Sequence, residues 1–117
     1  MSDSKNTLFG AHITELADLA KALGHPARVR ILEVLAQTPG CICGDIVEQL
    51  PLAQATVSQH LKELRRVELI AGEISGPRTC YCLNTETLTR ARAMFTDLFT
   101  GIGCCQTEGE IHEFKSE

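Results

Sequence analysis

The sequence has 117 residues, of which 44% are hydrophobic and 22% charged, and its formal net charge is −4. This length and composition predict one globular domain with a modest core, and the negative charge argues against an indiscriminate nucleic-acid binder. The polar start contains no signal peptide pattern, and no apolar stretch approaches the length of a membrane span. We therefore expect a cytoplasmic protein, in which six cysteines indicate metal ligands or redox sensors before disulfides.

The apolar pattern predicts two helices near the start of the chain. Beginning at residue 11, apolar residues recur at helical spacing: Ile13, Leu16, Ala17, Ala20 and Leu23. Gly24 ends this helix and Pro26 begins the next, which runs to about residue 37. A bridge strand at residues 41–43 and a short helix at residues 45–50 are expected to follow.

Residues 54–66 predict the helix that gives the chain its function. Val57, Leu61 and Leu64 form one apolar stripe that faces the core. The opposite face has hydrogen-bonding groups first and cations later: Gln54, Thr56, Ser58, Gln59, Lys62 and Arg65. A helix in the DNA major groove needs this order, with amides and hydroxyls toward bases and cations toward phosphates. With the short helix before it, this stretch predicts a helix-turn-helix; the alternative is an ordinary amphipathic helix with a solvated face.

After residue 67 the period changes from helical to alternating. Residues 69–74 and 78–83, joined by a Ser-Gly-Pro turn, predict a β-hairpin. Such a hairpin directly after the recognition helix is a wing. Arg78 stands at its tip, where it holds a phosphate or is simply solvated.

Asn84 or Thr85 caps a last helix, whose apolar stripe is wide: Leu88, Ala91, Phe95, Leu98, Phe99 and Ile102. The stripe exceeds what one small domain needs, so we expect the first and last helices to form a two-fold dimer interface rather than only an intramolecular core. The predicted fold is mainly α with a small β-wing, a winged helix-turn-helix with five helices and a β-hairpin, as a homodimer. Residues 1–10 form a flexible N-terminus, 11–103 the DNA-binding and dimerisation domain, and 104–117 a cysteine-containing acidic tail.

Three segments resemble the ArsR/SmtB family of winged-helix metal-sensing repressors. They are Ala-Leu-Gly-His-Pro-Ala-Arg-Val-Arg-Ile-Leu at 22–32, Gln-Ala-Thr-Val-Ser-Gln-His-Leu at 54–61, and the end of the wing at Tyr-Cys-Leu 81–83. The resemblance covers about residues 13–100. It implies a homodimer that binds double-stranded operator DNA and leaves it when a thiophilic ion or, in some members, a redox signal is sensed. It implies neither an enzyme nor a membrane partner.

Three residues depart from the family pattern. Ala53 stands where Ser usually begins the recognition helix, and it cannot cap the helix with its side chain. Glu68 stands where Gly commonly precedes the first wing strand. Gly44 separates Cys43 from Asp45, whereas a C-x-C in the family's arsenic sensors is followed at once by Asp. Because one step along a strand reverses the side-chain direction, that arsenic site does not transfer directly.

The six cysteines form three close pairs, Cys41/Cys43, Cys80/Cys82 and Cys104/Cys105. Thiolates select soft ions such as cuprous, zinc-group or arsenite-like species, and the alternative is buried cysteines that fill gaps. In a winged helix the segment before the helix-turn-helix pairs with the second wing strand, which would bring the first pair beside the second. In some family members a cysteine after the last helix faces one near the end of the second helix. The first pair belongs to both clusters and ranks first as ligands, the third pair second, and Cys80/Cys82 last.

The leading hypothesis is a repressor released from its operator when these thiolates bind trivalent arsenic or another thiophilic ion as effector. The alternative keeps DNA binding but uses a disulfide or polysulfide between the 41/43 and 104/105 pairs. A thiol enzyme or metal carrier is disfavoured, because no C-x-x-C and no activating His or acid is present. Gln54, Thr56, Ser58 and Gln59 are predicted to contact bases and Lys62, Arg65 and Arg78 phosphates, while His60 touches DNA or packs beside it.

Overall fold

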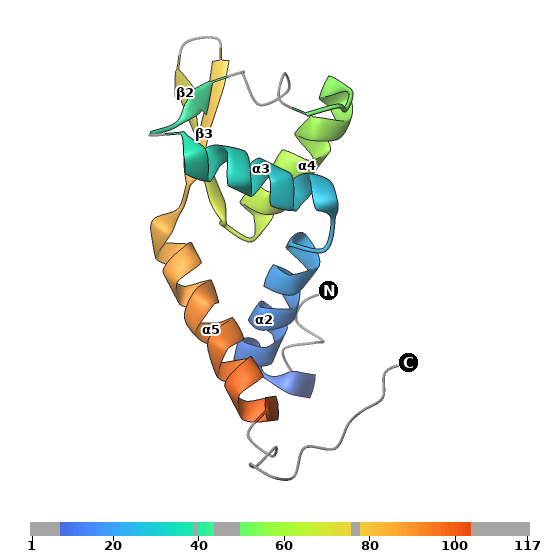
Figure 1. Cartoon of the computed structure of the whole chain (residues 1–117), viewed down its shortest axis with the longest axis vertical. Helices are drawn as coiled ribbons and strands as arrows, with labels where there is room; N and C mark the ends of the chain where they lie inside the picture. The colour runs from blue at the N-terminus through green and yellow to red at the C-terminus, as the bar shows by residue number, and fades with distance from the viewer. Residues whose placement is uncertain (1–7, 39, 44–49, 76–77, 104–117) are drawn as a thin grey trace.

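The computed structural model describes residues 8–38, 40–43, 50–75 and 78–103 (Figure 1). In chain order the elements are α2 (Ala11–Ala22), α3 (Pro26–Gln37), β1 (Ile42–Cys43), α4 (Gln54–Arg66), β2 (Ile70–Ser75), β3 (Arg78–Leu83) and α5 (Thr85–Gly103). The described residues therefore form four helices instead of the five predicted. The remaining helix was expected at residues 45–50, and residues 44–49 lie outside the description. None of the helices described is both long and apolar enough to span a membrane.

The junction between α2 and α3 is held by two side chains of the α3 start. The Nδ1 atom of His25 accepts a hydrogen bond of 3.0 Å from the N–H of Ala27, which caps α3, and Pro26 occupies the first helical turn. Arg28 donates from Nε to the carbonyl of Ala22 at 2.6 Å and from Nη2 to that of Lys21 at 3.2 Å. One guanidinium thus bonds to two carbonyls at the end of α2, and that of Lys21 also accepts the N–H of Gly24 at 3.0 Å.

The apolar stripe predicted for α4 is confirmed. Val57, Leu61 and Leu64 are buried, and they share one core cluster with residues of α3 such as Ile31 and Val34. Each such side chain contributes about 1.5–3 kcal/mol when fully buried. The burial of this face fixes the opposite face of α4 toward solvent.

The end of α4 explains the unusual position of Glu68. The N–H of Glu68 bonds to the carbonyl of Arg65 at 2.9 Å, and that of Leu69 to the carbonyl of Leu64 at 3.1 Å. These bonds form a Schellman motif, in which the residue after the helix adopts the left-handed conformation. Glu68 has a φ of 64° there, a conformation that costs a residue with a Cβ about 1–2 kcal/mol.

The predicted hairpin is confirmed, and β1 extends it to a three-stranded sheet of order β1-β3-β2. In the hairpin Ile70 pairs with Leu83 and Ser75 with Arg78. On the other side of β3, Ile42 pairs with Tyr81 and Cys43 with Cys80, both antiparallel. The segment before the helix-turn-helix therefore lies against the second wing strand, as the sequence predicted.

Helices α2 and α5 lie together in the lower half of Figure 1, away from the sheet. The apolar face predicted for α2 is divided between core and surface. Leu16 and Leu23 are partly buried against the core, whereas Ile13, Ala17 and Ala20 are exposed. The buried apolar residues of α2 are Leu19 and Ala22. Apolar residues occur around most of this helix, so spacing alone could not choose between its two apolar faces.

Among the described residues, those that cover α5 lie against its first half. Asn84 caps it by accepting a hydrogen bond of 3.3 Å from the N–H of Thr87, as predicted. Ala91 and Met94 are buried, whereas exposure is 39% at Leu98, 62% at Phe99 and 65% at Ile102. The second half of the predicted stripe is therefore left open by residues 8–38, 40–43, 50–75 and 78–103.

Glu68→Gly is expected to stabilise the fold by about 1 kcal/mol, because Gly adopts the left-handed conformation without a steric cost. The measurement is the free energy of unfolding in urea. The matched control is Glu33→Gly at an exposed position within α3, where the same substitution should destabilise by about 1 kcal/mol. Equal destabilisation by both substitutions would contradict the strain assigned to Glu68.

Candidate functional site

The outer face of α4 carries the polar side chains that the sequence placed there, and all of them are exposed: Gln54, Thr56, Ser58, Gln59, Lys62 and Arg65. The first turns of α4 stand at the margin of the molecule, at the upper right of Figure 1. Ala53 precedes α4 and supplies no side-chain hydrogen bond. The first N–H groups of α4 therefore lack the usual side-chain cap.

The cations predicted to hold phosphates have different surroundings. Lys62 is exposed on α4. Arg65 is exposed too, but its side chain lies over Gly72 of β2, where an added Cβ would be 3.4 Å from the Arg65 Cζ. Arg78 begins β3 and pairs through its backbone with Ser75. Gly72 thus leaves room for Arg65 to cross the wing strand next to α4.

Of the two alternatives predicted for His60, the structure favours packing beside the DNA-binding face. His60 is 9% exposed, and its Nδ1 lies 3.1 Å from Nη1 of Arg28. Its ring centroid is 4.3 Å from that of His25. Burial lowers the pKa of His60, and the nearby His25 and Arg28 lower it further. His60 occupies the inner side of α4, three residues after Val57 and four before Leu64, so helical spacing alone could have assigned it to the core.

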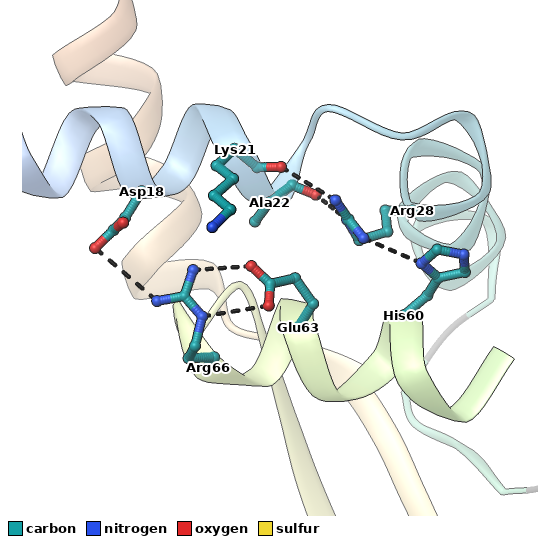
Figure 2. A network of polar contacts seen from close by, with 7 residues as sticks. All are labelled: Asp18, Lys21, Ala22, Arg28, His60, Glu63 and Arg66. Carbon is teal, nitrogen blue, oxygen red and sulfur yellow. Dashed lines mark hydrogen bonds and ion pairs between the residues drawn. The ribbon is translucent and has the colours of Figure 1, made fainter. Parts of the chain in front are cut away.

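Polar side chains join α2 to α4 in two places, which Figure 2 shows from close by. In the first, Arg28 spans the carbonyls at the end of α2 and His60. In the second, Arg66 donates to Glu63 at 2.8 Å and lies 3.9 Å from Asp18. The hydrogen bond from Arg66 lowers the pKa of Glu63, and the same bond raises the pKa of Arg66. The Arg66 side chain is 46% exposed, so solvent limits what this ion pair contributes.

The strand pairing of β1 and β3 brings two cysteine pairs together. Cys41 and Cys82 are joined by a disulfide, and their Cα atoms are 4.2 Å apart. Cys80 is buried, with 3% exposure, and is also disulfide-bonded, while the backbone of Cys43 pairs with that of Cys80. The predicted proximity of the first and second cysteine pairs is therefore confirmed.

The proximity of the third pair to the first is not tested, because Cys104 and Cys105 lie outside the described residues. Within the described part of the chain, no three His, Cys, Asp or Glu side chains gather as a set of metal ligands. The last-ranked Cys82 is the cysteine whose sulfur meets that of Cys41.

A helix-turn-helix domain model matches residues 23–73. The arsenical resistance operon repressor of Staphylococcus xylosus is 36% identical over 74 residues, which are 63% of this chain and 70% of that protein. The chain belongs to the ArsR/SmtB family. Like other members of the family, it is a DNA-binding transcription regulator with a winged helix-turn-helix.

Two solved structures share the ArsR/SmtB fold with this chain. An ArsR-like transcriptional regulator from Rhodococcus sp. RHA1 has a TM-score of 0.65 at 19% identity, over 79% of this chain and 86% of that one. The winged helix-turn-helix domain Mb0332 from Mycobacterium bovis, described as homodimeric, has a TM-score of 0.60 at 24% identity, over 96% and 97% of the two chains.

Two substitutions on the outer face of α4 test its role in this family member. Gln59→Ala should relax sequence preference and cost about 1–3 kcal/mol, because it removes a side chain that is predicted to pair with base edges. Lys62→Ala should weaken binding to every sequence alike and reduce the salt slope by about one unit, because it removes a predicted phosphate contact. The measurement is fluorescence anisotropy with operator and unrelated DNA at several salt concentrations. Operator binding unchanged in both variants would place the DNA-binding surface elsewhere.

Proposed function

We propose that this chain is a homodimeric repressor that binds its operator through α4. It leaves the operator when cysteine thiolates at β1 and β3 bind a thiophilic ion, of which trivalent arsenic is the leading candidate. The proposed effector site rests on the disulfide between Cys41 and Cys82, which holds their sulfur atoms together. The arsenical resistance repressor among the relatives supports the same ion.

The DNA-binding part is supported by the exposed polar face of α4. Gln54, Thr56, Ser58 and Gln59 are the proposed base contacts, since their amides and hydroxyls match the donors and acceptors of base edges. Lys62, Arg65 and Arg78 are the proposed phosphate contacts. Because the chain is acidic overall, we expect weak non-specific affinity and a specific complex that depends on these few cations.

The dimer is supported by apolar surface that this chain leaves uncovered. Phe99 and Ile102 at the end of α5 are more than half exposed, as are Phe9 and Ile13 at the start of the chain's helical region. Since α2 and α5 lie together, these side chains belong to the same end of the molecule. A second copy that covers them by two-fold symmetry would bring two recognition helices into one assembly. The homodimeric relative Mb0332 supports this arrangement.

The thiol site is supported by the strand register. Trivalent arsenic is a soft centre that prefers thiolate sulfur. Cys41, which directly precedes β1, and Cys82 on β3 are joined by a disulfide, so its reduction would leave two thiols side by side. A third thiolate is proposed from Cys43, which is two residues from Cys41, or from Cys104 and Cys105. An ion held between β1 and β3 would pull the segment that leads into the helix-turn-helix toward the wing.

A second candidate function is favoured by the bond between Cys41 and Cys82 itself. In this alternative the effector is an oxidant such as a peroxide. Two thiols lose two protons and two electrons to it, a disulfide forms, and the peroxide is reduced to two molecules of water. This replaces the partner expected from the sequence, Cys104 or Cys105, with Cys82. Both candidates keep α4 as the DNA-binding helix and differ only in what joins the two sulfurs.

Cys41→Ser and Cys82→Ser should each keep operator binding and lose release. Effector coupling of about 1–3 kcal/mol makes wild-type binding roughly 5- to 150-fold weaker when the thiols are engaged. The measurement is anisotropy of labelled operator, with arsenite plus a non-thiol reductant in one series and with peroxide alone in the other. Release in the first series supports the ion, and release in the second alone supports the disulfide.

The matched comparison is the double variant Cys104→Ser with Cys105→Ser. In this variant the release of operator by the effector should be reduced but not lost. Normal release by Cys41→Ser and Cys82→Ser in both series would remove the effector site from β1 and β3. Full loss of release in the 104/105 variant alone would move it to the C-terminal tail.

Phe99→Glu should weaken dimerisation by about 2–4 kcal/mol, because it places an unpaired charge in the proposed interface. Since Phe99 is exposed in the single chain, the fold of each monomer should be retained. Sedimentation equilibrium measures the dimer, and Thr96→Glu, an exposed position off the apolar stripe of α5, is the control. Equal dimer stability in both variants would contradict an interface on this face.

A further inference from the structure

Arg28 contacts three helices with one guanidinium. It belongs to α3, it donates to the carbonyls of Lys21 and Ala22 at the end of α2, and its Nη1 lies 3.1 Å from Nδ1 of His60 on α4 (Figure 2). Each of its three nitrogens is therefore directed at a different partner atom. Lysine cannot replace this fork, because its single ammonium lacks the fixed planar arrangement of donors.

The geometry determines the protonation state of His60. Arginine only donates hydrogen bonds, so Nδ1 of His60 accepts the bond and carries no proton. His60 is therefore neutral, with its proton on Nε2. The neighbouring His25 is also an acceptor through Nδ1, since it takes the hydrogen bond from the N–H of Ala27.

The charged and titratable groups near His60 come from all three helices. Among the described residues they are Asp18 and Lys21 of α2, His25 and Arg28 at the start of α3, and Glu63 and Arg66 of α4. The carboxylates of Asp18 and Glu63 are engaged by Arg66, whereas His25 and Arg28 face His60 itself. An additional positive charge on His60 would thus meet a cation at hydrogen-bond distance.

We propose that Arg28 and His60 form a proton-sensitive latch, which positions α4 for DNA binding and opens in mild acid when His60 gains a proton. This inference rests on the proposed function of α4 as the DNA-binding helix. Arg28 and His60 act as positioning residues and do not touch the operator. Protonation would convert the acceptor into a donor that faces the donors of Arg28, and the link from the end of α2 to α4 would be lost.

The sign of the pH effect separates this latch from an ordinary DNA contact. A histidine near a phosphate strengthens binding when it becomes charged, whereas opening the latch weakens it. The folded-state pKa of His60 lies below its ordinary value of 6.5, because burial and the neighbouring cations disfavour the charged form. Its contribution to stability is therefore complete above about pH 6.5 and is lost as the pH falls through the folded-state pKa.

The test is operator affinity of the full-length protein between about pH 7.5 and pH 5.5, the range in which histidine titrates. Wild-type affinity should fall as the pH drops below the folded-state pKa of His60, by at most tenfold per pH unit because one proton is linked, and therefore by at most about tenfold at pH 5.5. His60→Asn should bind equally across the range, because the Asn Oδ1 replaces Nδ1 as an acceptor that does not titrate. His12→Asn, at an exposed position of α2, is the control and should follow the wild type.

Two further variants distinguish the latch from general loss of packing. His60→Gln places its carbonyl beyond the reach of Arg28 and should bind weakly at every pH. His25→Asn keeps a cap for α3 but removes the ring whose centroid lies 4.3 Å from that of His60, so His60 becomes less buried and the midpoint of the wild-type transition should move to higher pH. An affinity that rises in acid, or an unchanged pH slope in His60→Asn, would overturn the proposal.

A measurement on the wild type alone supplies an independent check. By reciprocal linkage, operator binding must lower the pKa of His60 below its value in the free protein, which NMR titration of the ring measures. A higher pKa in the complex would overturn the latch. If Gln59→Ala and Lys62→Ala bind DNA like the wild type, the proposed role of α4 in DNA binding is contradicted, rather than the latch. In that case the latch remains visible as acid-dependent stability that His60→Asn abolishes.

Discussion

The burial of one face of α4 is the constraint on which the rest of the structure depends. Val57, Leu61 and Leu64 enter the core with α3, and this alone directs the polar residues between them outward. The Schellman motif at Glu68 then turns the chain directly into β2, so the wing begins beside the same helix. Arg65 over Gly72 shows how closely the two elements approach.

Most of the fold could be predicted from sequence, because periodicity and turn residues specify local structure well. The bounds of α4, the hairpin, the His25–Pro26 helix start and the Asn84 cap all followed from spacing and residue type. The inward face of α2 did not, since Ile13, Ala17 and Ala20 are as apolar as the residues that are buried. Only tertiary packing against α4 and α5 decides between the two faces.

The residue types of the candidate site could be predicted from the sequence, but the side chains that these residues contact could not. The C-x-C spacing placed Cys41 and Cys43 on a strand, and winged-helix topology put that strand beside Cys80 and Cys82. Register is set by pairing, and a shift of one residue reverses every side chain, so the sequence could not select Cys82 as the partner of Cys41. The sequence left His60 open as a DNA contact or a packed residue, because its polarity favours the surface and its position one turn from Val57 favours the core. Its burial is compensated by a hydrogen bond with Arg28, a partner 32 residues away in the chain.

The link between Cys41 and Cys82 also changes the topology of the chain. Its two ends are separated by 41 residues, and the enclosed segment contains the whole of α4 and β2. Closing a loop of this length removes enough entropy from the unfolded chain to stabilise the fold by about 4 kcal/mol. The oxidised chain would therefore hold its DNA-reading helix within a covalent ring. A protease cut inside that ring would leave both fragments attached until a reductant separated them.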